Sequence, residues 1–197
     1  MRRVVDRGLH AGARLCLVAA LSVAAVAASG PRSATGIDLQ GRTVDPLAAD
    51  RGKATVLVYV RTDCPVSSRY APTVQKLAAE YGGKSKFWLV YPAKTDTVPV
   101  IEKYLKDFEY KLDALQDPGR GLVKVGDAEI TPSVSVFSAN GELLYHGRID
   151  NWYEDFGRAR REPTTHELAD ALAAVVAGKR PAVSTAPAVG CYISDLQ

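Results

Sequence analysis

The chain has 197 residues, of which 47% are hydrophobic and 24% are charged, and its formal net charge is +3. This length and apolar content fit one globular domain with appendages, and they exclude a disordered, fibrous or polytopic membrane protein. The net charge predicts no nucleic-acid partner, because the four arginines and one aspartate of residues 1–27 account for all of it.

Residues 1–29 differ in kind from the rest of the chain. Four arginines precede an apolar run over residues 15–28, which ends in the small residues Ala-Val-Ala-Ala. A basic start, a short apolar middle and small residues at its end predict a secretory signal peptide, and hence a periplasmic or secreted protein. A membrane span needs about 20 residues, so an uncleaved anchor is the less favoured alternative.

The remainder divides into three segments. Residues 30–50 are rich in turn-forming residues, and two short runs within them predict a hairpin at a sheet edge. Residues 51–180 carry strand and helix patterns and form the predicted domain. Residues 181–197 are a tail of mostly small residues that carries Cys191.

The first half of the predicted domain alternates strands and helices. A continuous β-branched run over 54–60 predicts a strand covered on both faces, which is typical of a parallel sheet between helices. Residues 66–81 and 98–108 show helical spacing, and a second buried strand over 86–92 lies between them. Parallel strands joined by a helix make a right-handed βαβ unit.

The second half predicts a hairpin followed by a helix. After a short strand over 112–116 and a helical turn over 121–125, residues 133–138 alternate with period two. Asn140-Gly141 predicts a turn into an antiparallel strand over 142–148. Residues 151–161 are interpreted as a long loop, and a capping box from Thr164 to Glu167 predicts the start of a final helix.

Cys64 is the candidate nucleophile. It follows the strand over 54–60 and precedes Pro65, and proline suits the first position of a helix. The free N–H groups and the dipole at a helix start stabilise a thiolate, which is the reactive form of cysteine. We expect this sulfur to be accessible to a second sulfur or an oxidant. The alternative is an inert cysteine that packs at the end of the strand.

Two charged residues near Cys64 are candidates for tuning its reactivity. A positive charge at Arg69 favours the thiolate, and a negative charge at Asp63 opposes it. Alternatively, both residues belong to a solvated helix edge.

The order of elements resembles the thioredoxin fold, an α/β fold with a central mixed sheet flanked by helices. Residues 36–178 are similar to its redoxin branch, the alkyl hydroperoxide reductase and thiol-specific antioxidant superfamily. The features that carry the resemblance are Thr-Asp-Cys64-Pro after a strand, Thr131-Pro132 before a strand, and Asn140-Gly141 followed by Leu-Leu-Tyr. The resemblance implies that Pro132 is cis, that the backbone of Thr131 faces the redox cysteine, and that both residues shape the substrate face.

The resemblance also implies an oxidoreductase without an organic cofactor. Its partner would be a thiol or disulfide protein, or a small thiol or peroxide. Ser67 stands where thioredoxins carry their second cysteine, so a disulfide within the motif is excluded. Leu57 and Arg61 replace the proline and threonine of peroxiredoxins, whose later arginine is also missing, and a strict peroxidase is therefore disfavoured. Val60 stands where copper-delivery relatives have a first cysteine.

Export would leave Cys64 and Cys191 as the two cysteines of the mature chain. About 13 residues follow Gly178 before Cys191 and span up to ~43 Å when extended, whereas a domain of this size has a radius of gyration near ~15 Å. The tail can therefore bring Cys191 to Cys64, and Gly190 permits a tight approach. Three interpretations remain open: a resolving thiol, a structural disulfide clip and two unpaired thiols.

Two classes of function follow. The first is an exported redoxin that carries out thiol–disulfide exchange or thiol-dependent reduction, with Cys64 as nucleophile and Cys191 as resolving thiol. The second is a non-catalytic module that binds copper, haem or a partner protein and uses a Cys64–Cys191 disulfide as a clip. No metal site is predicted, because His146 and two cysteines without close spacing make a weak ligand set.

Overall fold

A computed structural model of the chain describes residue 1, residues 33–48, residue 50 and residues 52–193. The predicted signal peptide, apart from Met1, lies outside the described residues. Within the described part of the chain, no helix has the length and apolar character needed to cross a membrane.

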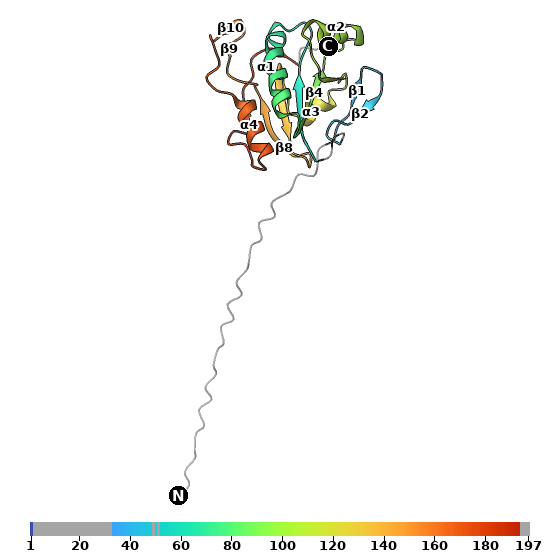
Figure 1. Cartoon of the computed structure of the whole chain (residues 1–197). Coiled ribbons are helices and arrows are strands. Elements are labelled where there is room, and N and C mark those ends of the chain that lie inside the picture. Colours follow the sequence, from blue (N-terminus) through green and yellow to red (C-terminus); the bar gives the residue numbers. More distant parts are fainter. Residues whose placement is uncertain (2–32, 49, 51, 194–197) are drawn as a thin grey trace.

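An 8-stranded mixed sheet runs through the middle of the molecule (Figure 1). From edge to edge its strands are β11 (Thr185–Ala186), β8 (Leu143–Gly147), β7 (Ser133–Phe137), β3 (Ala54–Tyr59), β4 (Ser85–Tyr91), β5 (Asp113–Gln116), β1 (Gly36–Asp38) and β2 (Thr43–Val44). Strands β3, β4 and β5 run parallel, and β7 and β8 form an antiparallel pair beside β3. The predicted α/β fold class is confirmed. Strands β1 and β2 pair antiparallel at one edge of the sheet.

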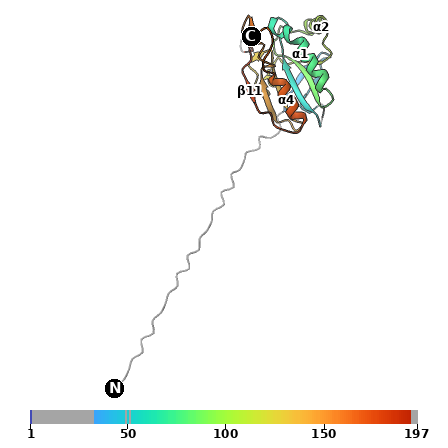
Figure 2. The same cartoon turned by 60° about the vertical axis from the view of Figure 1, so that its left-hand side comes forward.

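Helices cover both faces of this sheet. Helices α1 (Pro65–Tyr81), α2 (Val98–Asp107) and α4 (Glu167–Val176) pack on one face, and α3 (Gly121–Val125) packs on the other. Figure 2 shows α1 and α4 beside each other over the sheet. The two faces have separate apolar cores, which we name the α1-side cluster and the α3-side cluster. The buried members of the α3-side cluster are Leu57, Tyr59, Trp88, Val90, Leu115, Leu122, Val123, Phe137 and Ile193.

Strand β3 shows why a continuous apolar run is needed in the centre of the sheet. All six of its residues are buried. Val56 and Val58 belong to the α1-side cluster, whereas Leu57 and Tyr59 belong to the α3-side cluster. Successive side chains of a strand point to opposite faces, so both faces of β3 must be apolar.

The capping box predicted at residues 164–167 is wrong. Helix α4 begins at Glu167, and its N-cap is His166, which makes no side-chain capping bond. The carboxylate of Glu167 instead accepts hydrogen bonds from the side chains of Arg148 and Thr165. A stronger partner in the tertiary structure therefore replaces the local cap.

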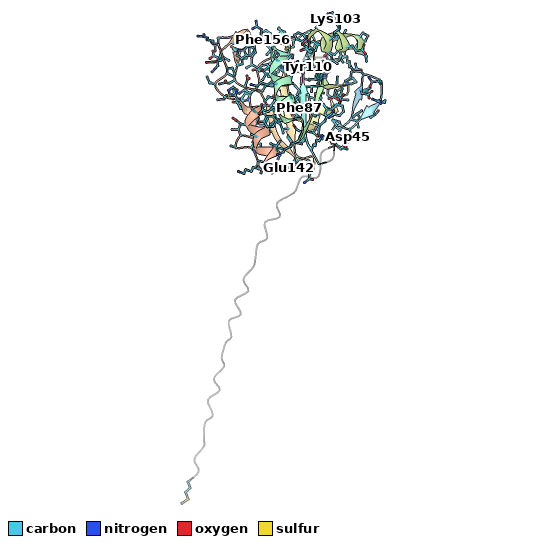
Figure 3. The ribbon with its side chains drawn as sticks, in the orientation of Figure 1. Asp45, Phe87, Lys103, Tyr110, Glu142 and Phe156 are labelled. Carbon is cyan, nitrogen blue, oxygen red and sulfur yellow. The ribbon has the colours of Figure 1, made fainter. Side chains whose placement is uncertain are left out.

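The sequence suggested a long loop over residues 151–161, but the structure has regular elements there. These residues contain a two-stranded hairpin of β9 (Tyr153–Asp155) and β10 (Arg158–Ala159). In Figure 1 this hairpin, the start of α1 and α2 lie at the same end of the molecule. Figure 3 shows Phe156 of the hairpin and Lys103 of α2 at that end, with Glu142 at the opposite end.

Residues 181–193 of the tail are part of the folded structure, which their mostly small side chains did not indicate. Strand β11 pairs in parallel with β8 and extends the main sheet by one strand. Strand β12 (Cys191–Tyr192) pairs antiparallel with β6 (Ile130–Thr131). Ile193, just after β12, is 2% exposed and lies in the α3-side cluster. We name residues 185–193 the docked tail.

Candidate active site

Cys64 lies where the sequence placed it, at the start of α1. It is the N-cap residue of the helix, with φ −90° and ψ 113°, and Pro65 follows within the first turn. Its carbonyl oxygen accepts the N–H of Ser68 at 3.2 Å, which is the first hydrogen bond of the helix. The N–H groups of Val66 and Ser67 precede this bond and have no carbonyl partner within the helix, so the positive end of the helix dipole faces the thiol.

The Cys64 side chain is 0% exposed, so the expected access for an outside oxidant is absent in this state. A second sulfur does reach it: the Sγ atoms of Cys64 and Cys191 are 3.1 Å apart. Both cysteines are free thiols, since a disulfide bond brings its sulfurs to about 2.05 Å. The tail that covers Cys64 therefore carries the second thiol.

Thr131 and Pro132 form the wall opposite Cys64. The peptide bond between them is cis, as the resemblance implies. The Cys64 thiol donates a hydrogen bond to the carbonyl oxygen of Thr131 at 3.4 Å. The Thr131 hydroxyl donates to the carbonyl oxygen of Cys191 at 3.3 Å. Thr131 thus contacts both cysteines.

Gly190 permits the close approach of Cys191 that the sequence predicted. A Cβ atom at Gly190 would lie 2.0 Å from the carbonyl oxygen of Thr131 and 3.1 Å from the ring of Pro132. No side chain fits in that space, and the obstructing atom belongs to the backbone. Only glycine lets the tail lie this close to the wall of the site.

The Cys191 thiol keeps its proton in this arrangement. Burial raises the pKa of the Cys191 thiol to about 12, and the hydrogen bond that it donates to the Cys64 sulfur acts in the same direction. Cys64 is the acceptor in that bond. The two sulfurs are therefore unequal, with a proton held on Cys191 and directed at Cys64.

Arg61 is the cation of the site. Its guanidinium donates two hydrogen bonds to the Asp63 carboxylate, at 2.9 and 2.8 Å, and its side chain is 17% exposed. Burial opposes the charge of Arg61, but Asp63 and both cysteine sulfurs outweigh this effect and raise the pKa of the guanidinium. The positive charge of Arg61 in turn favours ionisation of Cys191. Sequence reasoning missed this role, although Arg61 stands in the short turn before the thiol.

The two predicted tuning residues occupy different settings. Asp63 is exposed and is paired with Arg61, so its charge is largely balanced. Arg69 has an exposed side chain on α1.

A buried carboxylate anchors the turn between β3 and α1. Asp96 is 1% exposed, and its Oδ1 atom accepts the hydroxyl of Thr62 at 2.5 Å and the N–H of Thr62 at 3.3 Å. Burial raises the pKa of Asp96 despite these bonds. The sequence offered no sign of this contact, because the two residues are 34 positions apart.

Ser67 also supports the turn. It is buried, and its hydroxyl accepts the N–H of Arg61 at 3.4 Å. The residue that stands at the position of a second motif cysteine therefore holds the backbone that leads to Cys64.

Among the described residues, no group of three or more His, Cys, Asp or Glu side chains is placed to hold one metal ion. His146 lies in β8, where its Nδ1 atom is 3.2 Å from the carbonyl oxygen of Asp127.

Comparison with known proteins adds structural relatives only. No protein-family model matches the chain, and no curated protein matches its sequence. A hypothetical protein from Sinorhizobium meliloti is similar in structure, with a TM-score of 0.70 and 21% identity over 83% of this chain and 92% of that one. An uncharacterised conserved protein from Geobacillus kaustophilus gives a TM-score of 0.71 and 20% identity over 82% of this chain and 87% of that one.

The thioredoxin domain of a thiol-disulfide oxidoreductase from Bacteroides vulgatus is also similar. Its TM-score is 0.52, with 16% identity over 60% of this chain and 85% of that one. The chain has a thioredoxin-like fold. Within this thioredoxin-like fold, Cys64 lies at the start of the helix after the central strand, and the cis Thr131–Pro132 bond faces it. The docked tail packs on that side.

Proposed function

We propose that the chain is an exported thiol–disulfide oxidoreductase in which Cys64 is the nucleophile and Cys191 is the resolving thiol. The observation that carries the proposal is the pair of free sulfurs 3.1 Å apart at the start of α1. The thiol-disulfide oxidoreductase among the structural relatives supports the class of reaction. Export rests on the leader predicted over residues 1–29, and an extracytoplasmic compartment tolerates a disulfide between the two cysteines.

The first step forms a mixed disulfide. The Cys64 thiol loses its proton to solvent, and the resulting thiolate attacks one sulfur of the partner's disulfide. A bond forms between those two sulfurs, and the partner's disulfide bond breaks. The partner's other sulfur leaves as a thiolate and takes a proton from water. Cys64 lies at the start of α1, and the guanidinium of Arg61 interacts electrostatically with its sulfur.

The second step releases the partner. The Cys191 thiol loses its proton to solvent and attacks the Cys64 sulfur, which forms the Cys64–Cys191 bond and expels the partner's second thiolate. Once Cys64 is bonded to the partner's sulfur, it no longer accepts the hydrogen bond of the Cys191 thiol as a free cysteine does. One cause of the raised Cys191 pKa is then gone. The partner's disulfide has been reduced by two electrons, and the two cysteines have been oxidised by two.

A dithiol reductant returns the enzyme to its starting state by the same chemistry in the opposite direction. If the chain instead starts oxidised, the same two steps run in reverse and transfer the disulfide to a partner dithiol. The substrate in either direction is a thiol or disulfide on a protein, or a small thiol compound.

A turnover assay tests the proposal in a Cys16→Ser background, which removes the only other cysteine. Reduced protein is mixed with a small disulfide and a dithiol reductant, and released thiol is measured. The Cys16→Ser chain is expected to turn over, and Cys64→Ser is expected to be inactive. Cys191→Ser, mixed with the small disulfide and no dithiol, is expected to form the mixed disulfide once and then stall, which mass spectrometry detects.

Turnover that survives Cys64→Ser would contradict the proposal. A Cys64–Cys191 disulfide that forms but never exchanges with a partner would instead favour the structural clip.

A further inference from the structure

A pocket of about 490 Å³ lies at the end of the molecule opposite Cys64. Glu142 lines this pocket, and Figure 3 shows Glu142 at the end away from Phe156 and Lys103, where α1 begins. The pocket lies among the start of β3, the end of α1, the turn between β7 and β8, and the end of α4. It shares no residue with the site that holds the two sulfurs.

Three Gly-Lys dipeptides from distant parts of the chain line this pocket. The dipeptides are Gly52-Lys53, Gly83-Lys84 and Gly178-Lys179. The first precedes β3, the second follows α1 and the third follows α4. The 197-residue sequence contains no other Gly-Lys dipeptide. The fold therefore gathers all copies of this dipeptide at one place, which we name the Gly-Lys pocket.

The glycines leave the wall of the Gly-Lys pocket open beside each lysine. A Cβ atom added at Gly52, Gly83 or Gly178 would meet nothing within 4 Å. Each lysine therefore follows a position without a side chain, and a ligand can approach the backbone there.

The Gly-Lys pocket carries a local excess of positive charge. Its charged lining residues are Lys53, Lys84, Glu142, Lys179 and Arg180. Outside residues 1–27 the formal charges of the chain sum to zero, so this excess belongs to the pocket and not to the domain as a whole. A concave site lined by charges of one sign concentrates ions of the opposite sign.

The cations of the pocket differ in their partners. Arg180 pairs with Glu142 at 2.7 Å, and Lys53 pairs with Asp50 at 3.0 Å. The lysines of the other two Gly-Lys dipeptides form no ion pair within the described part of the chain. Two positive charges of the pocket are therefore left for a ligand.

Helix dipoles do not account for these two lysines. The negative end of a helix dipole attracts cations, but its effect falls off within the last turn of the helix. Lys84 lies beyond the end of α1 at Tyr81, and Lys179 lies beyond the end of α4 at Val176. Their shared feature is the pocket that both line.

We propose that the Gly-Lys pocket binds the phosphate group of an organic phosphate. Lysine ammonium and arginine guanidinium groups are common protein partners of phosphate. Leu144, Val175 and Val176 also line the pocket and offer apolar contact to the organic part of the ligand. The volume of the pocket falls in the range of roughly 300–1,000 Å³ that is typical of small-molecule sites. This inference is independent of the proposed thiol–disulfide exchange.

A soluble phosphate ester and a phospholipid headgroup share this chemistry, and the test separates them. Glycerol 3-phosphate is titrated into the full chain, and the backbone amides of Gly52, Gly83 and Gly178 are followed by NMR. Dihexanoyl phosphatidylglycerol, kept below its micelle concentration, is the second probe, and inorganic phosphate is the third. Signals from these three glycines report binding at the pocket itself.

The double substitution Lys84→Gln with Lys179→Gln is expected to weaken binding of glycerol 3-phosphate at least about tenfold, because it removes the two lysines without ion pairs. Lys106→Gln with Lys111→Gln is the matched control, since both lysines are exposed and lie outside the pocket. The control is expected to change binding less than about twofold, because distant surface charges are screened.

Glu142→Gln is expected to act in the opposite direction. It removes the carboxylate of the pocket and releases Arg180 from its ion pair, so glycerol 3-phosphate is expected to bind at least about threefold more tightly. Inorganic phosphate is expected to bind at least about threefold more weakly than glycerol 3-phosphate, because it makes no contact with the apolar lining.

Binding of glycerol 3-phosphate without the lipid would support a soluble ester as the ligand, and binding of both organic probes would support a lipid headgroup. Binding of neither would overturn the inference, and so would equal losses in the two double variants. A lowered free energy of unfolding in Lys84→Gln with Lys179→Gln, without phosphate binding in the unsubstituted chain, would assign the two lysines to stability alone.

Thiol–disulfide turnover of the same proteins is measured in parallel. The pocket variants are expected to keep the turnover of the unsubstituted chain, because the pocket lies at the far end of the molecule from Cys64. Absence of turnover with phosphate binding intact would refute the proposed function and leave the phosphate site standing.

Discussion

Cys64 and Cys191 are in contact, yet they are held in opposite ways. Cys64 joins a strand whose six residues are all buried to a helix of 17 residues. Cys191 lies in a strand of two residues, and β11, the only other strand of the docked tail, also has two. The position of Cys64 is therefore a property of the whole fold, whereas the position of Cys191 depends on a few local contacts.

Because of this difference, we expect Cys191 to move by local opening of the tail, while Cys64 stays in place. A segment with few buried apolar groups and short pairings opens locally at a cost well below global unfolding. The tail can leave and return while β3 and α1 keep Cys64 fixed. An enzyme whose second thiol resolves a mixed disulfide needs that combination, because the same place must admit a partner first and Cys191 afterwards.

The largest expected effect comes from a matched pair of truncations in the α3-side cluster. Leu57→Ala in β3 is expected to lower the free energy of unfolding by about 2–5 kcal/mol, because it leaves a cavity in the centre of the sheet. Ile193→Ala is expected to cost at most about 1 kcal/mol in global unfolding, because the tail opens independently. Urea denaturation measures both values.

The same two substitutions should rank in the opposite order by their effect on the rate of Cys64 alkylation. Ile193→Ala is expected to speed alkylation of Cys64 by opening the tail. If Ile193→Ala instead lowered the free energy of unfolding as much as Leu57→Ala, the tail would unfold together with the rest of the domain and would not open independently.

Alkaline pH should weaken docking of the tail. The docked Cys191 thiol has a pKa of about 12, against 9.0 when undocked, because burial and its hydrogen bond to Cys64 disfavour the thiolate. The contribution of this thiol to docking is thus fully present below pH 9 and is lost as the pH rises toward 12. At pH 10 the docking equilibrium is expected to fall about tenfold.

NMR signals of Ile193 between pH 8 and pH 10 measure the docked population. Cys191→Ser is the control, because a serine hydroxyl does not ionise in this range. Identical pH dependence in the two proteins would show that the Cys191 proton does not control docking.

The smallest expected effect concerns the cation at the site. Arg61→Gln is expected to slow alkylation of Cys64 by roughly threefold to tenfold at neutral pH, because it removes a positive charge that interacts with both sulfurs. Arg69→Gln is the matched control, with its side chain exposed on α1. An effect of Arg69→Gln equal to or larger than that of Arg61→Gln would indicate that Arg69, and not Arg61, tunes the thiol.

Much of the fold was predictable from sequence because the information is local. The run over 54–60, the Cys-Pro helix start and Asn140-Gly141 each determine their own structure through burial, capping or turn geometry. The helix start before α4 was mispredicted, because the ion pair of Arg148 with Glu167 overrides the capping box.

The features of the site that the sequence did not reveal depend on contacts between distant residues. Asp96 bonds Thr62 across 34 positions, and nothing in either segment marks that pairing. The strands of the docked tail could not be predicted from sequence, because Thr185–Ala186 and Cys191–Tyr192 are too short to show an alternating hydrophobic pattern. Its place follows from Gly190, Cys191 and Ile193 meeting Thr131 and the α3-side cluster together.

The most direct test of the account is a peptide map of the protein after it reduces a small disulfide. Reduced Cys16→Ser chain is reacted with the disulfide alone, quenched by alkylation and digested without reductant. The peptides of Cys64 and Cys191 are expected to become linked within one chain as two thiols of the reagent are released. Finding Cys64 and Cys191 both alkylated, with no linked peptide and no thiol released, would contradict it.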